Sequence, residues 1–151
     1  PELAIHFNWP NRIKVNGANC GYTFYKAATK LEEEIPEWLV IGINIPFLWS
    51  KSTESGRLPE ETVLFEEGCS EITPISLLES WSRHTLVWLN RFLDEGLLPV
   101  HNAWCEKCEN IGKKISYPKN GDFIGLDENG NMLLKKSNDI TIEKLIDYMD
   151  K

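Results

Sequence analysis

The sequence predicts an α+β protein in which a mixed or antiparallel sheet packs on two helices and a small β-rich module follows. Three observations favour this class. Short apolar segments typical of strands occupy the first 47 residues, an apolar repeat of three to four residues covers 74–95, and Gly-rich hairpin patterns follow residue 112. We therefore divide the chain into an α+β domain over 1–111 and a β-rich module over 112–151.

Composition and charge restrict the class of protein. The 151 residues are 42% hydrophobic and 26% charged, which is typical of a folded globular chain. The net charge of −7 repels phosphate backbones, so we expect no nucleic-acid partner. No apolar run approaches the ~18 residues that span a bilayer, and no secretory signal is visible. We therefore expect a cytoplasmic protein without a membrane partner.

The first part of the chain predicts three strands, at 3–9, 13–15 and 18–26. Pro10 stops the first strand. Asn16-Gly17 separates the next two, and this pair is a strong hairpin signal because a type I′ turn needs two residues that tolerate positive φ. The chain begins at Pro1 without a methionine and enters a strand pattern at once, so we expect the natural sequence to continue upstream.

A fourth strand is predicted within Glu37–Phe47. This stretch is a continuous apolar run with β-branched residues, which is typical of a strand buried on both faces. Residues 50–61 are rich in Ser, Thr, Glu, Gly and Pro, which predicts a long surface loop.

Two helices are predicted next. Thr73-Pro74 is a good helix start, with threonine as the N-cap and proline at the first helical position, and Gly96 provides the stop near residue 95. A second, shorter helix is expected over 99–110. In the module, 123–126 and 132–134 flank a turn and predict a hairpin, and 141–151 is an amphipathic strand or helix, with helix favoured.

The cysteines and histidines do not form a clear chemical motif. Cys105 and Cys108 have the spacing of paired metal or redox thiols, but Cys20 and Cys69 are isolated in sequence and the pair lies within a predicted helix. We favour structural cysteines over zinc or redox roles, and we assign no metal site. The histidines fall on unrelated elements, and no phosphate-binding glycine loop is present.

The most specific pattern joins two strand ends. Trp9-Pro10-Asn11, Asn16-Gly17, Cys20-Gly21 and Ile41–Ile45 follow one another in this order. The order resembles that of biotin and lipoate protein ligases, which carry W-P-N-D, x-N-G-K-K-x-A-G and G-I-N-V. Residues 121–134 also resemble the small SH3-like C-terminal domain of biotin ligases. The resemblance covers most of the chain and is best over 5–47.

The resemblance implies a two-step acyl transfer. ATP activates a small carboxylic acid, biotin or lipoate, to an acyl-adenylate, which a lysine of a biotin or lipoyl carrier protein then attacks. The family uses Mg²⁺ and a positioned lysine to offset the charge on the α-phosphate. ATP with Mg²⁺ and biotin or lipoate are thus the cofactor and substrates that the resemblance implies.

This sequence departs from the family pattern at the charged positions. Arg12 stands where the family carries an acid, and Asn19, or Ala18 with a shift of one, stands where it carries the lysine. The family's Arg/Gly-rich loop does not occur within residues 1–151. Each preorganised donor is worth about 10²–10³ in rate, so we expect little ligase activity from this chain alone and assign no catalytic residue.

Seven residues are predicted to lie near a ligand. Trp9 and Asn11 would shape the pocket, Arg12 would pair with a carboxylate or phosphate in place of a metal, and Gly21 and Gly42 would let the backbone approach the ligand. Two other interpretations stay open: a non-catalytic binding module on the ligase fold, and a structural or interaction domain. The predicted ligand-binding residues are Trp9, Asn11, Arg12, Asn19, Gly21, Gly42 and Asn44.

Overall fold

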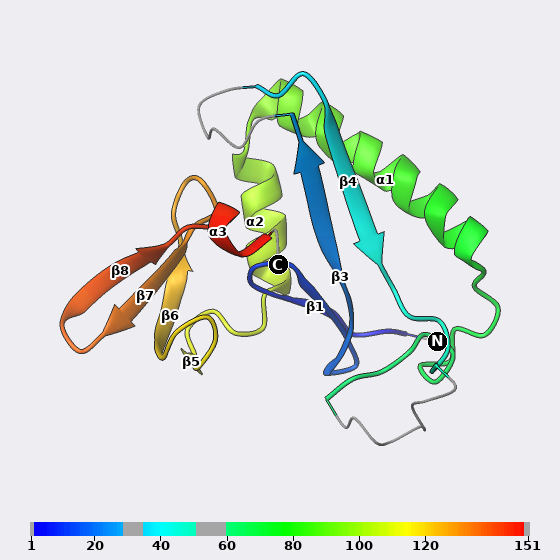
Figure 1. The fold of residues 1–151 in the computed structure, drawn as a ribbon, viewed down its shortest axis with the longest axis horizontal. Helices are drawn as coiled ribbons and strands as arrows, with labels where there is room; N and C mark the ends of the chain where they lie inside the picture. Colours follow the sequence, from blue (N-terminus) through cyan, green and yellow to red (C-terminus); the bar gives the residue numbers. More distant parts are fainter. Residues whose placement is uncertain (1, 29–34, 51–59, 150–151) are drawn as a thin grey trace.

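The computed structural model describes residues 2–28, 35–50 and 60–149, and within them it contains two four-stranded antiparallel sheets and three helices (Figure 1). The α+β class is confirmed, and both sheets are antiparallel rather than mixed. The predicted loop over 50–61 lies largely outside the described residues. The first sheet has the order β1-β2-β3-β4, with β1 (Ile5–Asn8), β2 (Arg12–Val15), β3 (Ala18–Ala27) and β4 (Leu39–Asn44).

The Asn-Gly hairpin between β2 and β3 is confirmed. Asn16 and Gly17 have φ of 50° and 90°, and Val15 pairs with Ala18 across the turn. The side chain of Asn16 also accepts a hydrogen bond from the Ala4 N–H at 3.0 Å, which ties the turn to the start of the chain. The turn thus sets the direction in which β3 returns along β2.

The prediction that the fourth strand is buried on both faces is wrong. Leu39, Val40 and Ile41 are 49%, 54% and 36% exposed. β4 pairs with β3 along one side, and it is the outermost strand of the first sheet as described. Its apolar sequence is therefore that of an interior strand, although it occupies an edge.

The helices α1 (Pro74–Glu95) and α2 (Leu98–Lys107) begin and end close to the predicted residues. The Thr73 side chain accepts a hydrogen bond from the Ser76 N–H, and Gly96 ends α1 with φ of 80°. α2 stops at Lys107 rather than at 110. Figure 1 shows α2 between the two sheets and α1 beside β4, at the far edge of the molecule from the second sheet. No residue of α1 is buried.

The second sheet forms the C-terminal module, with order β5-β6-β7-β8. The predicted hairpin over 121–134 is confirmed. The prediction of a helix over 141–151 is wrong for its first part. Residues Asp139–Glu143, whose polar and apolar side chains alternate, form a strand that pairs with β7. The elements are β5 (Lys114–Ile115), β6 (Gly121–Leu126), β7 (Met132–Lys136), β8 (Asp139–Glu143) and the one-turn helix α3 (Ile146–Met149).

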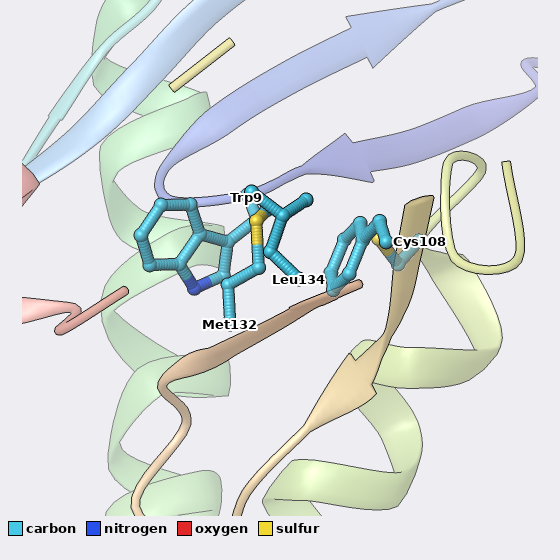
Figure 2. Packing of buried hydrophobic residues seen from close by; sticks show 5 residues of the cluster. Trp9, Cys108, Met132 and Leu134 are labelled. Carbon is cyan, nitrogen blue, oxygen red and sulfur yellow. The ribbon is translucent and has the colours of Figure 1, made fainter. Parts of the chain in front are cut away.

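Two apolar clusters hold these parts together. The junction cluster joins the first sheet, the end of α2 and the C-terminal module, and it comprises Trp9, Cys108, Phe123, Met132 and Leu134. Figure 2 shows the side chains of this cluster gathered together, with Trp9, Cys108, Met132 and Leu134 labelled. The second cluster lies between the β2–β3 hairpin and the segment before α1, and comprises Val15, Cys20, Leu64 and Cys69. The four cysteines are free thiols, and three of them are buried.

Candidate functional site

The strand ends singled out in the sequence meet in the first sheet. In the register of the sheet, Arg12 is opposite Tyr22, and Tyr22 is opposite Asn44. Residues opposite one another in neighbouring strands carry their side chains on the same face. The Arg12 guanidinium carbon lies 5.4 Å from the centroid of the Tyr22 ring, within the range of a cation–π contact. We call Arg12, Tyr22 and Asn44 the strand-end row.

Asn11 fixes the position of Arg12. Its side-chain Nδ2 donates to the Thr23 carbonyl at 2.7 Å, and the Thr23 N–H donates to the Asn11 carbonyl at 3.0 Å. These two hydrogen bonds fasten the β1–β2 turn to β3. Asn11 therefore positions the row, and its side-chain nitrogen already donates a hydrogen bond to the backbone.

Gly21 and Gly42 lie where β3 packs closely against β4. A Cβ on Gly21 would collide with the backbone oxygen of Asn44, and Gly21 has a φ of +117° that side chains rarely adopt. A Cβ on Gly42 would collide with the ring of Phe24, the residue opposite it in β3. The structure thus supplies a packing reason for both glycines, and Phe24 fills the space above Gly42.

Asn19 lies apart from the row, at the other end of the β2–β3 pair. Its backbone bonds to the segment after residue 59, with Asn19 N–H to the Glu60 carbonyl at 2.8 Å and Thr62 N–H to the Asn19 carbonyl at 2.9 Å. The residue opposite Asn19 is Lys14. This arrangement anchors the 60–62 segment to β3.

Lys14, the lysine nearest to the lysine positions of the family, is engaged in an ion pair. Its Nζ lies 2.6 Å from Oε1 of Glu109, and His6 Nδ1 lies 4.0 Å from the other oxygen. The hydrogen bond from Lys14, aided by its charge, outweighs burial and lowers the pKa of Glu109. Lys14 is therefore charge-compensated and largely shielded, and is not a free amine beside the row.

Trp9 lies in the junction cluster and not on the strand-end row. Its side chain is 3% exposed, its Nε1 donates to the Gly130 carbonyl at 3.0 Å, and its ring meets the Tyr148 ring edge-on at 5.2 Å between centroids. Trp9 also borders a cavity of about 170 Å³ between α2 and the C-terminal module. That cavity is lined by Trp9, Pro10, Leu97, Val100, His101, Trp104, Leu126, Asn129, Gly130 and Leu145.

The predicted residues therefore divide among three places. Arg12 and Asn44 share the strand-end row, supported by Asn11 and by the two glycines, whereas Asn19 and Trp9 serve other contacts. Tyr22 belongs to the row but was not predicted, because an aromatic residue in a strand is an ordinary packing residue by its sequence alone.

Within the described ranges, no three His, Cys, Asp or Glu side chains are placed to hold a metal ion. No helix of the described chain has the length and apolar character to cross a membrane.

The chain is similar to solved structures of biotin protein ligases. A biotin protein ligase-like protein of unknown function from Silicibacter sp. TM1040 is 34% identical and superposes with a TM-score of 0.85, covering 97% of this chain and 64% of that chain. Biotin protein ligase from Aquifex aeolicus, at 17% identity, has a TM-score of 0.72 and covers 92% of this chain and 61% of that one. The Aquifex aeolicus enzyme in complex with biotin and ATP has a TM-score of 0.67 at 15% identity, covering 91% and 58%.

The chain thus spans less than two thirds of the length of these structures. No curated protein matches it. The model of the biotin/lipoate A/B protein ligase family matches residues 1–106, which is more than half of the chain and includes the strand-end row. The chain is a member of the biotin/lipoate A/B protein ligase family.

Proposed function

We propose that this chain is a divergent ligase-like binding domain that holds a small carboxylic acid or its acyl-adenylate on the strand-end row. The observation that carries the proposal is the alignment of Arg12, Tyr22 and Asn44 across three neighbouring strands. Arg12 offers a cationic fork that suits a carboxylate or a phosphate. The Tyr22 ring offers a flat apolar surface, and the Asn44 amide offers both a donor and an acceptor.

Arg12 is well suited to an anion because its position is restricted before binding. Its guanidinium lies over the Tyr22 ring, and Asn11 fastens the preceding residue to Thr23. A preorganised arginine loses less conformational freedom on binding than a free one. The side chain itself is exposed, so its charge is available to a ligand.

The residues present do not fit a Mg–ATP activation site. Mg²⁺ prefers carboxylate and other oxygen ligands, and the position after Trp9-Pro10-Asn11 holds the cation Arg12 instead of an acid. The lysine positions of the family hold Ala18 and Asn19, and Lys14 is paired with Glu109. We therefore assign no ATP-dependent step to this chain, and a carrier protein as acceptor stays a prediction of the family resemblance.

Binding of the acyl-adenylate or the free acid tests the proposal. Thermal shift and isothermal titration with biotin, lipoate, octanoate, ATP and the acyl-adenylates should show a rise of several degrees with one acid or its adenylate, without release of AMP. Arg12→Ala should weaken that binding about tenfold or more, because a charge-assisted contact is lost. Arg91→Ala is the matched control, because Arg91 makes a similar contact with the Trp88 ring on α1.

Three outcomes contradict the proposal. A failure of every compound to bind favours a structural or interaction domain. Equal affinity of the Arg12→Ala and wild-type chains places the ligand elsewhere. Release of AMP from ATP with one of the acids shows that the chain alone is an active enzyme.

A further inference from the structure

Phe24 extends the surface of the strand-end row along β3. It lies two residues after Tyr22 in this strand, and alternate residues of a strand carry their side chains on the same face. The centroids of the two rings are 6.2 Å apart, and Phe24 is 38% exposed. On this face, the charge of Arg12 is therefore followed by two aromatic rings.

The Phe24 ring occupies the space that Gly42 leaves open on the same face. Gly42 is opposite Phe24 in β4, and a Cβ on Gly42 would lie 2.2–2.6 Å from three atoms of the ring. A glycine inside a strand often marks a place where another group approaches the backbone closely. At Gly42 that group is the ring of Phe24, so the chain itself fills the space above β4 that a ligand would otherwise enter.

The two rings do not lie in one plane. The Tyr22 and Phe24 rings are tilted by 50° to each other. A rigid ring system can lie flat against one of two tilted faces but not against both. A flexible unbranched chain can follow both faces, because it turns at each of its staggered torsions at little cost.

We propose that Phe24 determines which acids the strand-end row accepts, an inference that rests on the function proposed above. The carboxylate of the acid, or the phosphate of its adenylate, pairs with Arg12, and a flexible unbranched chain lies over Tyr22 and Phe24. An acid with a rigid fused ring gains less contact, because Phe24 fills the place where that ring could be buried against β4. Discrimination of this kind in an apolar site amounts to about 10- to 200-fold.

Isothermal titration of the 151-residue chain with butanoate, octanoate, biotin and their adenylates tests the inference. Octanoate should bind at least about tenfold more tightly than butanoate, since its additional methylene groups lie against the rings. It should also bind at least about tenfold more tightly than biotin, whose fused rings are rigid. The adenylates should show the same order, and comparison of each adenylate with its free acid shows which anion Arg12 prefers.

Replacement of Phe24 should change this preference. Phe24→Ala uncovers Gly42, so biotin should gain affinity, octanoate should lose it, and the ratio of their dissociation constants should change at least about tenfold. Phe24→Leu keeps a large apolar side chain opposite Gly42 and should retain the preference for octanoate. Phe92→Ala is the matched control, because Phe92 on α1 is similarly exposed at 44%, and it should leave every affinity unchanged.

Failure of this inference can be distinguished from failure of the proposed function. Octanoate that binds the wild-type chain no more tightly than butanoate or biotin would overturn the inference, and this comparison needs no variant to fold. A folded Phe24→Ala chain that keeps the wild-type ratio would overturn it too, since another feature then sets the ratio. Both results leave binding at Arg12 intact, whereas an absence of binding by every acid and adenylate overturns the proposed function as well.

Discussion

At the scale of single residues, Glu109 near the first sheet and Glu143 in the second sheet are each paired with neighbouring side chains. The Glu109 carboxylate accepts a hydrogen bond from the Lys14 ammonium, and this contact lowers the pKa of Glu109. Glu143 is buried, which raises its pKa, but hydrogen bonds from Lys119 and Tyr148 outweigh the burial and lower it. In turn, Glu143 raises the pKa of Tyr148 to about 12. Arg12 differs, because its described contact is with an aromatic ring rather than a carboxylate.

The Lys14–Glu109 pair predicts a pH-dependent contribution to stability. A carboxyl group whose folded pKa is depressed stabilises the fold above its unfolded pKa and loses that contribution as the pH falls through its folded pKa. Lys14→Met should therefore lower the free energy of unfolding by about 1 kcal/mol at pH 7. The difference from wild type should shrink below about pH 4.5. Urea unfolding from pH 7 to pH 3 measures it, and a difference that stays constant over this range contradicts the prediction.

The buried thiols show why sequence spacing misleads at this scale. Cys105 and Cys108 have the spacing of a paired site, but Cys108 is buried in the junction cluster, and burial raises the pKa of both thiols. Cys20 and Cys69 are 49 residues apart in the sequence (69 − 20) yet belong to one apolar cluster. Burial, with the nearby Glu67 charge, raises the pKa of Cys20 to about 11. These apolar surroundings agree with the structural role that the sequence analysis favoured for the cysteines.

At the scale of elements, the register of β2 and β3 builds the strand-end row. The Asn-Gly turn sets Val15 opposite Ala18, and a regular hairpin would continue to place Arg12 opposite Gly21. A bulge in β3 shifts the register, so that Arg12 is opposite Tyr22 instead. The left-handed φ of Gly21 lies at this irregularity. The bulge thus brings an aromatic ring under the guanidinium.

Replacement of Gly21 and Gly42 by alanine should cost different amounts of stability, because one glycine faces rigid backbone and the other faces a side chain. Gly21→Ala should cost at least about 2 kcal/mol, because the new Cβ meets the rigid backbone oxygen of Asn44 and the φ is unfavourable for alanine. Gly42→Ala should cost about 1 kcal/mol or less, since the Phe24 ring is the flexible, partly exposed end of a side chain. Urea denaturation of both variants tests the order. Equal costs would show that Asn44 gives way as easily as Phe24.

The sequence predicted elements well where local chemistry decides them. The Asn-Gly turn, the Thr73 cap and the Gly96 stop all act within a few residues, and each lies where it was predicted. The prediction that β4 is buried on both faces was wrong. An apolar run indicates that a segment forms a strand, but it does not indicate whether a neighbouring element covers that strand. The bulge and the strand at Asp139–Glu143 also depend on the partner strands, which single-sequence periodicity does not contain.

At the scale of the whole molecule, Trp9 links the two sheets. It follows β1, yet its indole donates to Gly130 in the C-terminal module and packs within the junction cluster. The place of Trp9 was not predicted from the sequence, since it depends on a module 121 residues away along the chain. The segment from Trp9 to Arg12 thus has two roles. Trp9 packs the first sheet against the C-terminal module, and Arg12 contacts the ligand that we propose.

The most direct measurement of the central claim is a map of amide and side-chain chemical shifts on titration with the acyl-adenylate. The account predicts that Arg12, Tyr22 and the side-chain amide of Asn44 shift in a saturable way, while the Trp9 indole N–H stays constant. Shifts confined to Trp9, Gly130 and the lining of the cavity beside α2, or no saturable shift at the strand-end row, would contradict it.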